Sequence, residues 1–287
     1  MIIWLASYPK SGNTWLRFFI ITLLMGNKTK INLNHLKAII DFPNLAQFKD
    51  LVSNFFDISE VSKKWIAAQE KINSDNNLRF LKTHNMLGKL NGYSFTNLKN
   101  TLGTIHIVRD PRNIITSLKN HYSFPSYSEA KKFLFYERNI ISLSNQEKEE
   151  FLKYNKKFPL PQYIGSWKTH YLSWRNMKKN CLLVKYENLI EDPINEFNKI
   201  VNFIEDLTNL KFDTQLIRDA VELSSFHKLK EMEQKYGFDE SPKNKEGKKN
   251  EFFYLGPQND WKRILENSVS DKISSEFKEE MKQLGYL

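Results

Sequence analysis

Residues 2–21 read IIWLASYPKSGNTWLRFFII, and this stretch decides the fold. An apolar run comes first, a short loop follows it, and a second apolar run continues the chain, which predicts a strand, a tight loop and a helix. The first turn of a helix carries unpaired backbone N–H groups and the positive end of the helix dipole, so it can bind an anion. Gly12 lets the backbone approach such a ligand closely, and Lys10 adds a positive charge. The stretch therefore predicts a phosphate-binding loop after the first strand.

The composition indicates a globular protein with an anionic partner. The chain has 287 residues, a hydrophobic share of 40% and a formal net charge of +10. Such a basic balance favours a nucleotide, an acidic glycan, nucleic acid or an anionic membrane, and the alternative is a lysine-rich solvated surface. Cys181 is the one cysteine of the sequence, and its apolar neighbours predict a buried strand residue. No run approaches the ~18 apolar residues of a membrane helix, and no signal-peptide pattern precedes the first strand, so we expect a cytoplasmic protein without stable membrane insertion.

Four short apolar runs predict the strands of a parallel sheet, over residues 2–7, 78–83, 104–109 and 181–186. Helical patterns separate them, over residues 14–25, 59–72, 111–121, 166–179, 193–203, 214–223 and 271–284. This alternation predicts an α/β fold, with a central parallel sheet flanked by helices on both faces, as a single domain over residues 1–287. Ligands of such sheets bind beyond the carboxyl ends of the strands.

Cationic or titratable side chains stand at these strand ends. Lys82 and His84 end the second strand, Arg109 ends the third and Tyr186 ends the fourth. A histidine with an unperturbed pKa of ~6.5 can accept a proton near neutral pH. An arginine can hold a phosphate through two hydrogen bonds, and Ser117, two helical turns further on, can complete the cradle with its hydroxyl.

The first loop differs from the Walker A loop of ATP-using kinases. A Walker A lysine directly follows the second glycine, whereas here Asn13 follows Gly12 and Lys10 precedes it. No predicted strand ends in an aspartate for magnesium, which phosphoryl transfer from ATP usually needs. A sulfuryl group carries less negative charge than a terminal phosphate, so a lysine without a metal can suffice. A kinase stays an alternative, as does a basic module that binds nucleic acid or another anion without catalysis.

Together these motifs resemble the sulfotransferases that use 3′-phosphoadenosine 5′-phosphosulfate (PAPS). The loop SYPKSGNTW at residues 7–15 is similar to the family's 5′-phosphosulfate loop, and RDPRNIITS at 109–117 is similar to its 3′-phosphate motif. The resemblance implies a P-loop-containing nucleotide-binding fold and a sulfuryl transfer to an acceptor hydroxyl or amine, with adenosine 3′,5′-bisphosphate (PAP) as product and no metal. We expect a small-molecule, lipid or glycan acceptor and, without any nucleic-acid-binding motif, no nucleic acid partner.

The resemblance also implies roles for particular residues. His84 would deprotonate the acceptor, Lys82 would stabilise charge on the transferring group, and Lys10 would stabilise the leaving phosphate. Arg109 and Ser117 would hold the 3′-phosphate. The remaining donor-binding residues would be Ser11, Gly12, Asn13 and Thr14 at the 5′-phosphate, Trp15, Tyr186, Ser224 and Phe226 around the adenine, and Gly256 in the segment that matches the family's Arg-Lys-Gly.

One segment departs from the family pattern. The family has Arg-Lys-Gly ahead of Gly-Asp-Trp-Lys, but residues 254–262 read YLGPQNDWK, so Tyr254 and Leu255 replace two cations expected near the 3′-phosphate. The basic, non-periodic stretch at 237–250 is predicted to be a mobile loop that could compensate. The family's C-terminal dimer motif is not recognisable, so the oligomeric state stays open.

Other stretches carry smaller predictions. Segments 41–65 and 122–161 match nothing in the family and are rich in phenylalanine and tyrosine, some of which should line the acceptor pocket. His106 lies inside a predicted strand and should be packed. Arg112 should be a solvated helix charge, and the Gly-Ser-Trp at residues 165–167 should be a structural helix start.

Overall fold

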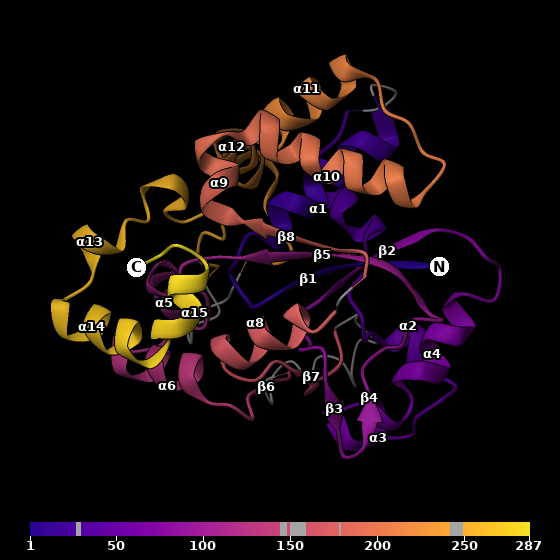
Figure 1. The fold of residues 1–287 in the computed structure, drawn as a ribbon, viewed down its shortest axis with the longest axis horizontal. Helices are drawn as coiled ribbons and strands as arrows, with labels where there is room; N and C mark the ends of the chain where they lie inside the picture. The colour runs from indigo at the N-terminus through magenta and orange to yellow at the C-terminus, as the bar shows by residue number, and fades with distance from the viewer. Residues whose placement is uncertain (27–29, 144–147, 150–158, 178, 242–248) are drawn as a thin grey trace. The chain divides into compact units, whose positions relative to one another are not determined.

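The central sheet has four strands in the order β2-β1-β5-β8 (Figure 1). The structure is a computed structural model that describes residues 1–26, 30–143, 148–149, 159–177, 179–241 and 249–287. β1 pairs with β2 in parallel, with Ile2 opposite Arg79 and Ala6 opposite Thr83. All four predicted strands are confirmed, and they are β1 (Ile2–Ser7), β2 (Arg79–Thr83), β5 (Thr101–Val108) and β8 (Cys181–Lys185).

Helices and two short hairpins make up the rest of the described secondary structure. The hairpins pair β3 (Lys89–Leu90) with β4 (Tyr93–Ser94) and β6 (Ile140–Ile141) with β7 (Gln162–Tyr163). The helices are α1 (Asn13–Met25), η2 (Leu33–Ala38), α2 (Leu45–Phe48), α3 (Ile58–Lys63), α4 (Trp65–Ile72), α5 (Pro111–His121), α6 (Tyr127–Phe135), α8 (Trp167–Arg175), α9 (Tyr186–Glu191), α10 (Pro193–Leu207), α11 (Thr214–Leu223), α12 (Phe226–Tyr236), η3 (Gly256–Gln258), α13 (Trp261–Ile264), α14 (Asn267–Glu276) and α15 (Lys278–Gln283).

Two predicted helices are each divided in the structure. The pattern over residues 59–72 forms α3 and α4, and the pattern over 271–284 forms α14 and α15. The second break falls at Phe277, which is buried and packs edge-on against Phe135 at 5.0 Å. Phe135 and Phe277 are far apart in the sequence, so the local hydrophobic pattern does not reveal their contact. That pattern continues without a break from α14 to α15. Half of the predicted loop over 237–250, residues 242–248, lies outside the described residues.

The chain divides into two compact units, and each is described by itself. Unit 1 comprises Met1–Tyr8, Ile39–His106 and Tyr136–Leu182. Unit 2 comprises Pro9–Ala38, Ile107–Phe135 and Leu183–Leu287. The prediction of a single domain over the whole chain stays a prediction.

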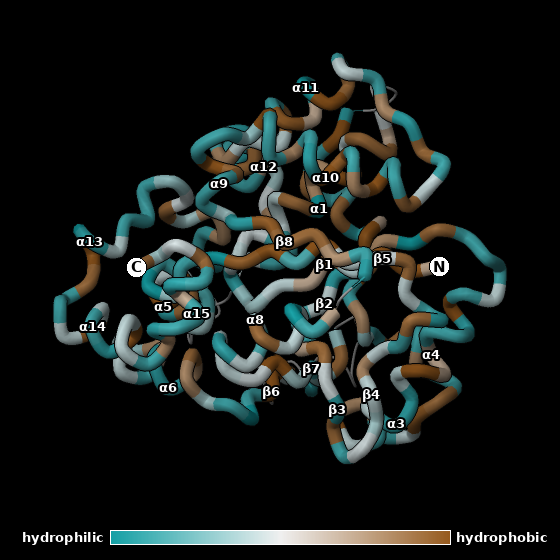
Figure 2. The backbone as a smooth tube through the Cα atoms, in the orientation of Figure 1, coloured by the Kyte–Doolittle hydropathy of each residue, from teal (hydrophilic) through white to brown (hydrophobic). Residues whose placement is uncertain are grey.

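Aromatic rings fill the core of unit 1, and Phe95 lies at their centre. The hydrophobic run of β1, visible in Figure 2, is fully buried and brings Trp4 into this core. The Phe95 ring centroid lies 5.1 Å from Trp4, 5.5 Å from Trp65 and 6.1 Å from Trp174, mostly edge-on. Such geometries add to the free energy gained by burying apolar area, so we expect this cluster to contribute strongly to the stability of unit 1.

In unit 2, α1 packs against α11, and α5 lies beside α6 and α14 (Figure 1). The prediction that Arg112 is a solvated charge was wrong. Its side chain is buried, pairs with Asp110 at 2.7 Å and lies 3.9 Å from the Trp261 ring centroid. It also donates a hydrogen bond of 2.6 Å to the carbonyl oxygen of Tyr286. Residues near the end of the chain cover Arg112, and no sequence pattern around residue 112 could reveal them.

Two histidines lie buried side by side in unit 1. The prediction that His106 is packed is confirmed, and its ring centroid lies 5.6 Å from that of His170. Burial lowers the pKa of His106 well below its usual value and lowers the pKa of His170 to about 3. Both imidazoles are therefore neutral in the folded protein over the physiological range.

Replacing Phe95 by alanine should strongly destabilise the protein. Loss of a ring at the centre of the cluster leaves a cavity, and such substitutions cost about 3–5 kcal/mol of unfolding free energy. Urea unfolding followed by tryptophan fluorescence measures this loss. Leu98→Ala is the matched control, because Leu98 is 70% exposed. Equal effects of the two substitutions would contradict the assignment of Phe95 to the core.

Stability should fall as the pH drops below about 6.5, the ordinary pKa of histidine. The folded pKa values of His106 and His170 lie below it, so their contribution is complete above that pH and is lost as the pH falls toward the folded values. We expect the urea midpoint to decrease between pH 7 and pH 5, and to decrease less steeply in His170→Gln. His227→Gln, at an exposed position, should retain the full slope. An unchanged slope in His170→Gln would argue against this linkage.

Candidate active site

The loop at residues 9–12 leaves the first turn of α1 open to an anion. Gly12 is the N-cap residue, and none of the described side chains caps the helix. The hydroxyl of Ser11 is completely buried and makes no hydrogen bond with any described residue. Gly12 has a φ of +107°, and a Cβ there would lie 2.5 Å from Cδ2 of Tyr186. Only glycine fits this close approach. The uncapped helix and the unsatisfied hydroxyl fit a bound phosphate group.

Lys10 adopts a conformation that is unusual for a residue with a side chain. Its φ is +67°, in the left-handed region, which carries a cost in backbone energy. The carbonyl oxygen of Lys10 accepts a hydrogen bond of 3.1 Å from Nη1 of Arg109. Its Nζ lies 3.8 Å from the Phe252 ring centroid and 3.5 Å from Nδ1 of His121. These contacts, all within unit 2, hold the loop in the shape that the anion site requires.

Arg109 and Tyr186 lie together in unit 2, on a cavity of about 360 Å³. The guanidinium carbon of Arg109 lies 4.1 Å from the Tyr186 ring centroid, and both side chains are buried. Burial raises the pKa of the Tyr186 hydroxyl, which is therefore protonated near neutral pH. Gly256 and Asn259 also line the cavity. A cation, a phenol and an amide around one cavity suit a phosphorylated nucleoside.

The predicted adenine-binding residues also come together in unit 2. Nε1 of Trp15 donates a hydrogen bond of 3.3 Å to Oγ of Ser224, and the Trp15 ring lies edge-on to Tyr186 at 5.8 Å. Phe226 lies directly against Gly256, where a Cβ would come within 2.3 Å of the Phe226 ring. Trp15, Tyr186, Ser224 and Phe226 thus lie in one neighbourhood, and Gly256 of the 254–262 segment lies against Phe226. Their roles toward an adenine stay predictions.

In unit 1, the backbone of Ser7 orients the His84 ring. Nδ1 of His84 lies 2.7 Å from the Ser7 carbonyl oxygen and 3.3 Å from the Ser7 hydroxyl. A carbonyl oxygen only accepts, so Nδ1 carries the proton and Nε2 of the neutral ring carries the lone pair. The His84 backbone N–H donates a hydrogen bond of 2.7 Å to Oε1 of Gln162. The ring is half-buried and held in the tautomer that a base acting through Nε2 needs.

Lys82 forms an ion pair with a residue that sequence reasoning missed. Its Nζ lies 2.8 Å from Oδ1 of Asp41, and both side chains are largely buried. The backbones of the two residues form a parallel bridge, which adds residues around Asp41 to the edge of β2. Asp41 begins the segment 41–65 that matched no family motif, so nothing in the sequence linked it to Lys82. The predicted role of Lys82 in charge stabilisation stays a prediction.

Two further residues of unit 2 were missed for the same reason. Arg17 is buried, donates to Oγ1 of Thr14 at 3.3 Å and pairs with Glu240 at 2.7 Å. Asn259 donates to Oγ of Ser117 at 3.4 Å. Both contact predicted phosphate-binding hydroxyls. The available signal for Arg17 was an arginine within the apolar helical run after Thr14, because a guanidinium on a buried helix face needs a polar partner. Asn259 lies in the compared segment 254–262, but at a position where the family pattern has a glycine.

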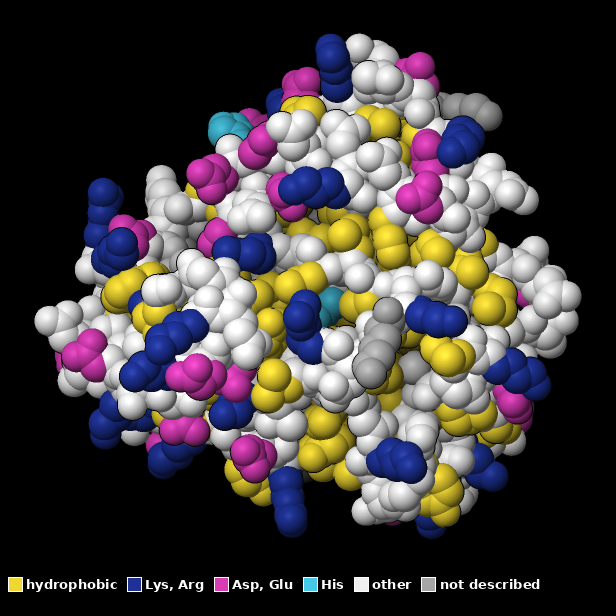
Figure 3. All heavy atoms as spheres, in the orientation of Figure 1, with side chains coloured by type: hydrophobic (Ala, Val, Ile, Leu, Met, Phe, Trp, Pro, Cys, Tyr) yellow, Lys and Arg dark blue, Asp and Glu magenta, His cyan; other side chains and the backbone are white. Residues whose placement is uncertain are grey.

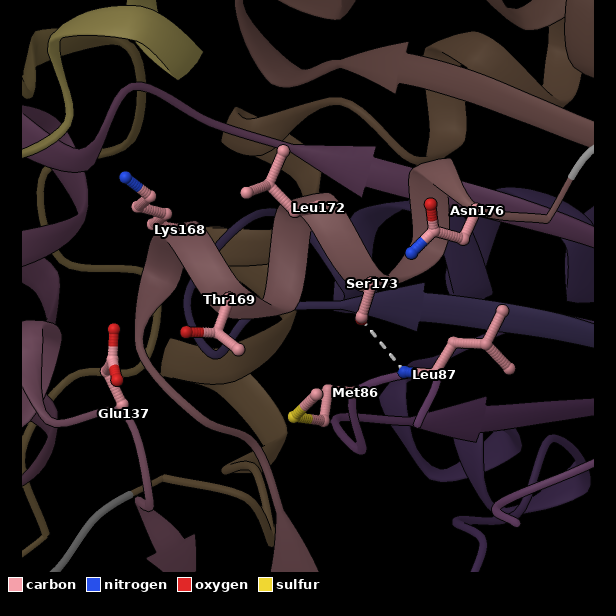
Figure 4. Close-up of a pocket in the computed structure, with 8 residues that line it drawn as sticks. All are labelled: Met86, Leu87, Glu137, Lys168, Thr169, Leu172, Ser173 and Asn176. Carbon is pink, nitrogen blue, oxygen red and sulfur yellow. Dashed lines mark hydrogen bonds between the residues drawn. The ribbon is translucent and has the colours of Figure 1, made fainter. Parts of the chain in front are cut away.

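A separate groove of about 360 Å³ lies in unit 1 beside α8 (Figure 4). Lys168, Thr169 and Leu172 of α8 line it together with Met86, and the Thr169 side chain lies on the side of α8 nearer Met86. Oγ of Ser173 accepts a hydrogen bond of 2.9 Å from the backbone N–H of Leu87 across the groove. Among the residues that the structure describes, no aromatic side chain of segments 41–65 and 122–161 lines it. Phe48, from the first of these segments, belongs to the core instead.

The remaining predictions concern single positions and the net charge. Ser166 caps α8 and accepts a hydrogen bond from the Thr169 N–H, which confirms the structural helix start. Cys181 begins β8 as predicted, but the prediction that it is buried was wrong: it is only partly buried, and that burial raises the pKa of its thiol to about 11. Lysine and arginine side chains are dispersed over the face seen in Figure 3, among acidic and uncharged ones. None of the described helices is long and apolar enough to cross a membrane.

Comparison with known proteins gives the family. Residues 2–285 match the model of the sulfotransferase domain. Cytosolic sulfotransferase 6 of Arabidopsis thaliana is 24% identical over 292 residues, which cover 98% of this chain and 78% of the relative.

Two solved structures show the same fold. A mouse sulfotransferase complexed with PAP has a TM-score of 0.56 and 19% identity, covering 98% of this chain and 84% of its own. Retinol dehydratase in complex with androsterone and the inactive cofactor PAP has a TM-score of 0.60 and 16% identity, covering 98% and 80%. The predicted P-loop-containing α/β fold is confirmed, and neither the kinase nor the non-catalytic module is favoured. The chain belongs to the sulfotransferase family.

Proposed function

We propose that this protein transfers the sulfuryl group of PAPS to a hydroxyl, or an amine, of a small acceptor. One observation carries the proposal: the uncapped start of α1, with the buried and unsatisfied Ser11 hydroxyl. Arg109 and Tyr186 line a cavity in the same unit, which supports a nucleotide with phosphates at two positions. The family match over residues 2–285 supports sulfuryl transfer over phosphoryl transfer.

The donor-binding residues in this proposal all belong to unit 2. When bound, PAPS supplies an electrophilic sulfur and a phosphate leaving group. The backbone N–H groups at the start of α1 bind the 5′-phosphate, and Lys10 stabilises the charge that develops on it during transfer. Arg109 and Ser117 anchor the 3′-phosphate and thereby position the reacting end. The residues assigned to the donor are Lys10, Ser11, Gly12, Asn13, Thr14, Trp15, Arg109, Ser117, Tyr186, Ser224, Phe226 and Gly256.

His84 acts as the general base in this proposal. The hydrogen bond from its Nδ1 to the Ser7 carbonyl supports this role, because it places the lone pair on Nε2. The proton of the acceptor hydroxyl passes to Nε2 as the oxygen attacks sulfur. Asp41 supports Lys82 in a defined position, from which Lys82 stabilises negative charge on the transferring group. This step uses no metal.

We base the proposed class of acceptor and the proposed cellular location on the relatives. Retinol dehydratase holds androsterone in its structure, and the Arabidopsis relative is named a cytosolic enzyme. We therefore propose a small, largely apolar alcohol as acceptor and the cytoplasm as location. We also propose that residues 1–287 act as one domain, because the family model spans nearly all of them.

Replacing His84 by alanine should abolish transfer and leave donor binding intact. Loss of a general base typically lowers turnover by about 10²–10⁴-fold. Turnover is measured with labelled PAPS and a panel of small alcohols, and PAP affinity by calorimetry. His227→Ala is the matched control, because this histidine is exposed. Near-normal turnover of His84→Ala would refute the base assignment.

Replacing Gly12 by alanine should prevent donor binding. The new Cβ would meet the Tyr186 ring at 2.5 Å, and φ is +107°. We expect PAP affinity to fall by about 100-fold or more, since the loop must shift away from the anion. Gly26→Ala is the control: it also has a positive φ, but a Cβ there meets nothing within 4 Å. If both variants bind PAP like the wild type, Gly12 does not lie in the donor site.

A further inference from the structure

Asn259 is a buried amide at the end of the donor site where two family cations are missing. Tyr254 and Leu255 replace the basic pair, and the Tyr254 side chain is 46% exposed. Asn259 follows η3 in the same turn, is only 5% exposed and lines the cavity together with Arg109. Asn259 thus lies a few residues after the positions at which the family pattern has its basic pair.

The nitrogen end of this amide is held by α5. Nδ2 of Asn259 donates a hydrogen bond of 2.7 Å to the carbonyl oxygen of Asn113 and one of 3.4 Å to Oγ of Ser117. The Trp261 backbone N–H donates to Oδ1 of Asn113 at 2.9 Å, so a second hydrogen bond to α5 holds the segment that contains Asn259. Asn259 is therefore rigid and lies next to the serine assigned to the 3′-phosphate.

The oxygen end of the amide has no partner among the described residues. Oδ1 of Asn259 is buried and accepts no hydrogen bond from them. A buried acceptor without a donor is destabilising, and most such atoms in proteins are satisfied by protein, water or ligand. Asn259 lines the cavity, so a ligand bound there is the candidate donor to this oxygen.

We propose that Asn259 is a specificity-determining residue that recognises the ribose 2′-hydroxyl of the donor. The 2′-hydroxyl is attached to the carbon next to the one that carries the 3′-phosphate, and Asn259 contacts Ser117 at that phosphate. The hydroxyl donates its hydrogen to Oδ1, the one hydrogen-bonding atom of the amide that α5 does not engage. This inference rests on the proposed function, because it takes PAPS as the donor.

The test compares PAP with 2′-deoxyadenosine 3′,5′-bisphosphate by calorimetry. The two ligands differ only in the 2′-hydroxyl, and one hydrogen bond is worth about a five- to tenfold difference in affinity. We expect the wild type to prefer PAP by this factor and Asn259→Ala to show no preference. Gln258→Ala, at an exposed neighbouring position, should keep the preference.

Asn259→Asp gives a second, opposite expectation. Aspartate keeps an acceptor oxygen but loses the Nδ2 donor and adds a negative charge near the 3′-phosphate. Both ligands should therefore bind more weakly than to the wild type, while the preference for the 2′-hydroxyl remains. Thermal unfolding of each variant shows whether it is folded. If a variant is not folded, the preference of the wild type for PAP over its 2′-deoxy analogue still tests the inference.

Two results would overturn the inference. One is a wild type that binds PAP and its 2′-deoxy analogue equally. The other is an Asn259→Ala variant that loses affinity for both ligands alike and keeps the preference, because this indicates a purely structural role. Failure of the proposed function looks different: the wild type would then bind PAP no better than adenosine 5′-phosphate, and the inference would fall with it.

Discussion

The close approach between the Gly12 backbone and the Tyr186 ring is the constraint on which the donor site depends. A Cβ at residue 12 would lie 2.5 Å from that ring, so α1 can begin at this point only without a side chain. The positive φ of Gly12 turns the chain so that the first N–H groups of α1 have no capping side chain among the described residues. Tyr186 in turn lies under Arg109, which binds the Lys10 carbonyl oxygen. One steric contact thus links the anion loop, a cation and the aromatic wall of unit 2.

Two buried arginines of unit 2 show that the surroundings of a charged side chain decide what it can bind. Arg109 and Arg112 are three residues apart and both buried, yet their surroundings differ. Arg112 is neutralised by Asp110 and stacks on Trp261, so its interactions are satisfied within the protein. Arg109 lines the cavity, lies against the Tyr186 ring and donates to the Lys10 carbonyl oxygen. A guanidinium that lines a cavity can also bind an anionic ligand there.

In unit 1, hydrogen bonds with Ser7 and Gln162 orient His84. A backbone carbonyl, which cannot donate, accepts from Nδ1 and thereby selects the tautomer. Burial keeps the neighbouring His170 neutral, with a pKa lowered to about 3, so no second imidazolium competes for a proton near neutral pH. His84 is half-buried whereas His170 is fully buried, and burial is what separates the residue proposed as the base from the one that fills the core.

The sequence by itself determined the four strands, the starts of some helices, such as those at Pro111 and Pro193, and the order of the motifs. These features depend on neighbours within a few residues: apolar runs, a proline at a helix start, a glycine before an amphipathic stretch. Residues 7–15 and 109–117 were recognisable because the chemistry of a phosphate cradle is carried by adjacent residues. Only the tertiary structure decided the burial of Arg112 by the chain end, the pairing of Lys82 with Asp41 and the position of Asn259 beside Ser117. Each of these contacts joins residues at least 41 positions apart, as Asp41 and Lys82 are, and such contacts form only when the chain has packed.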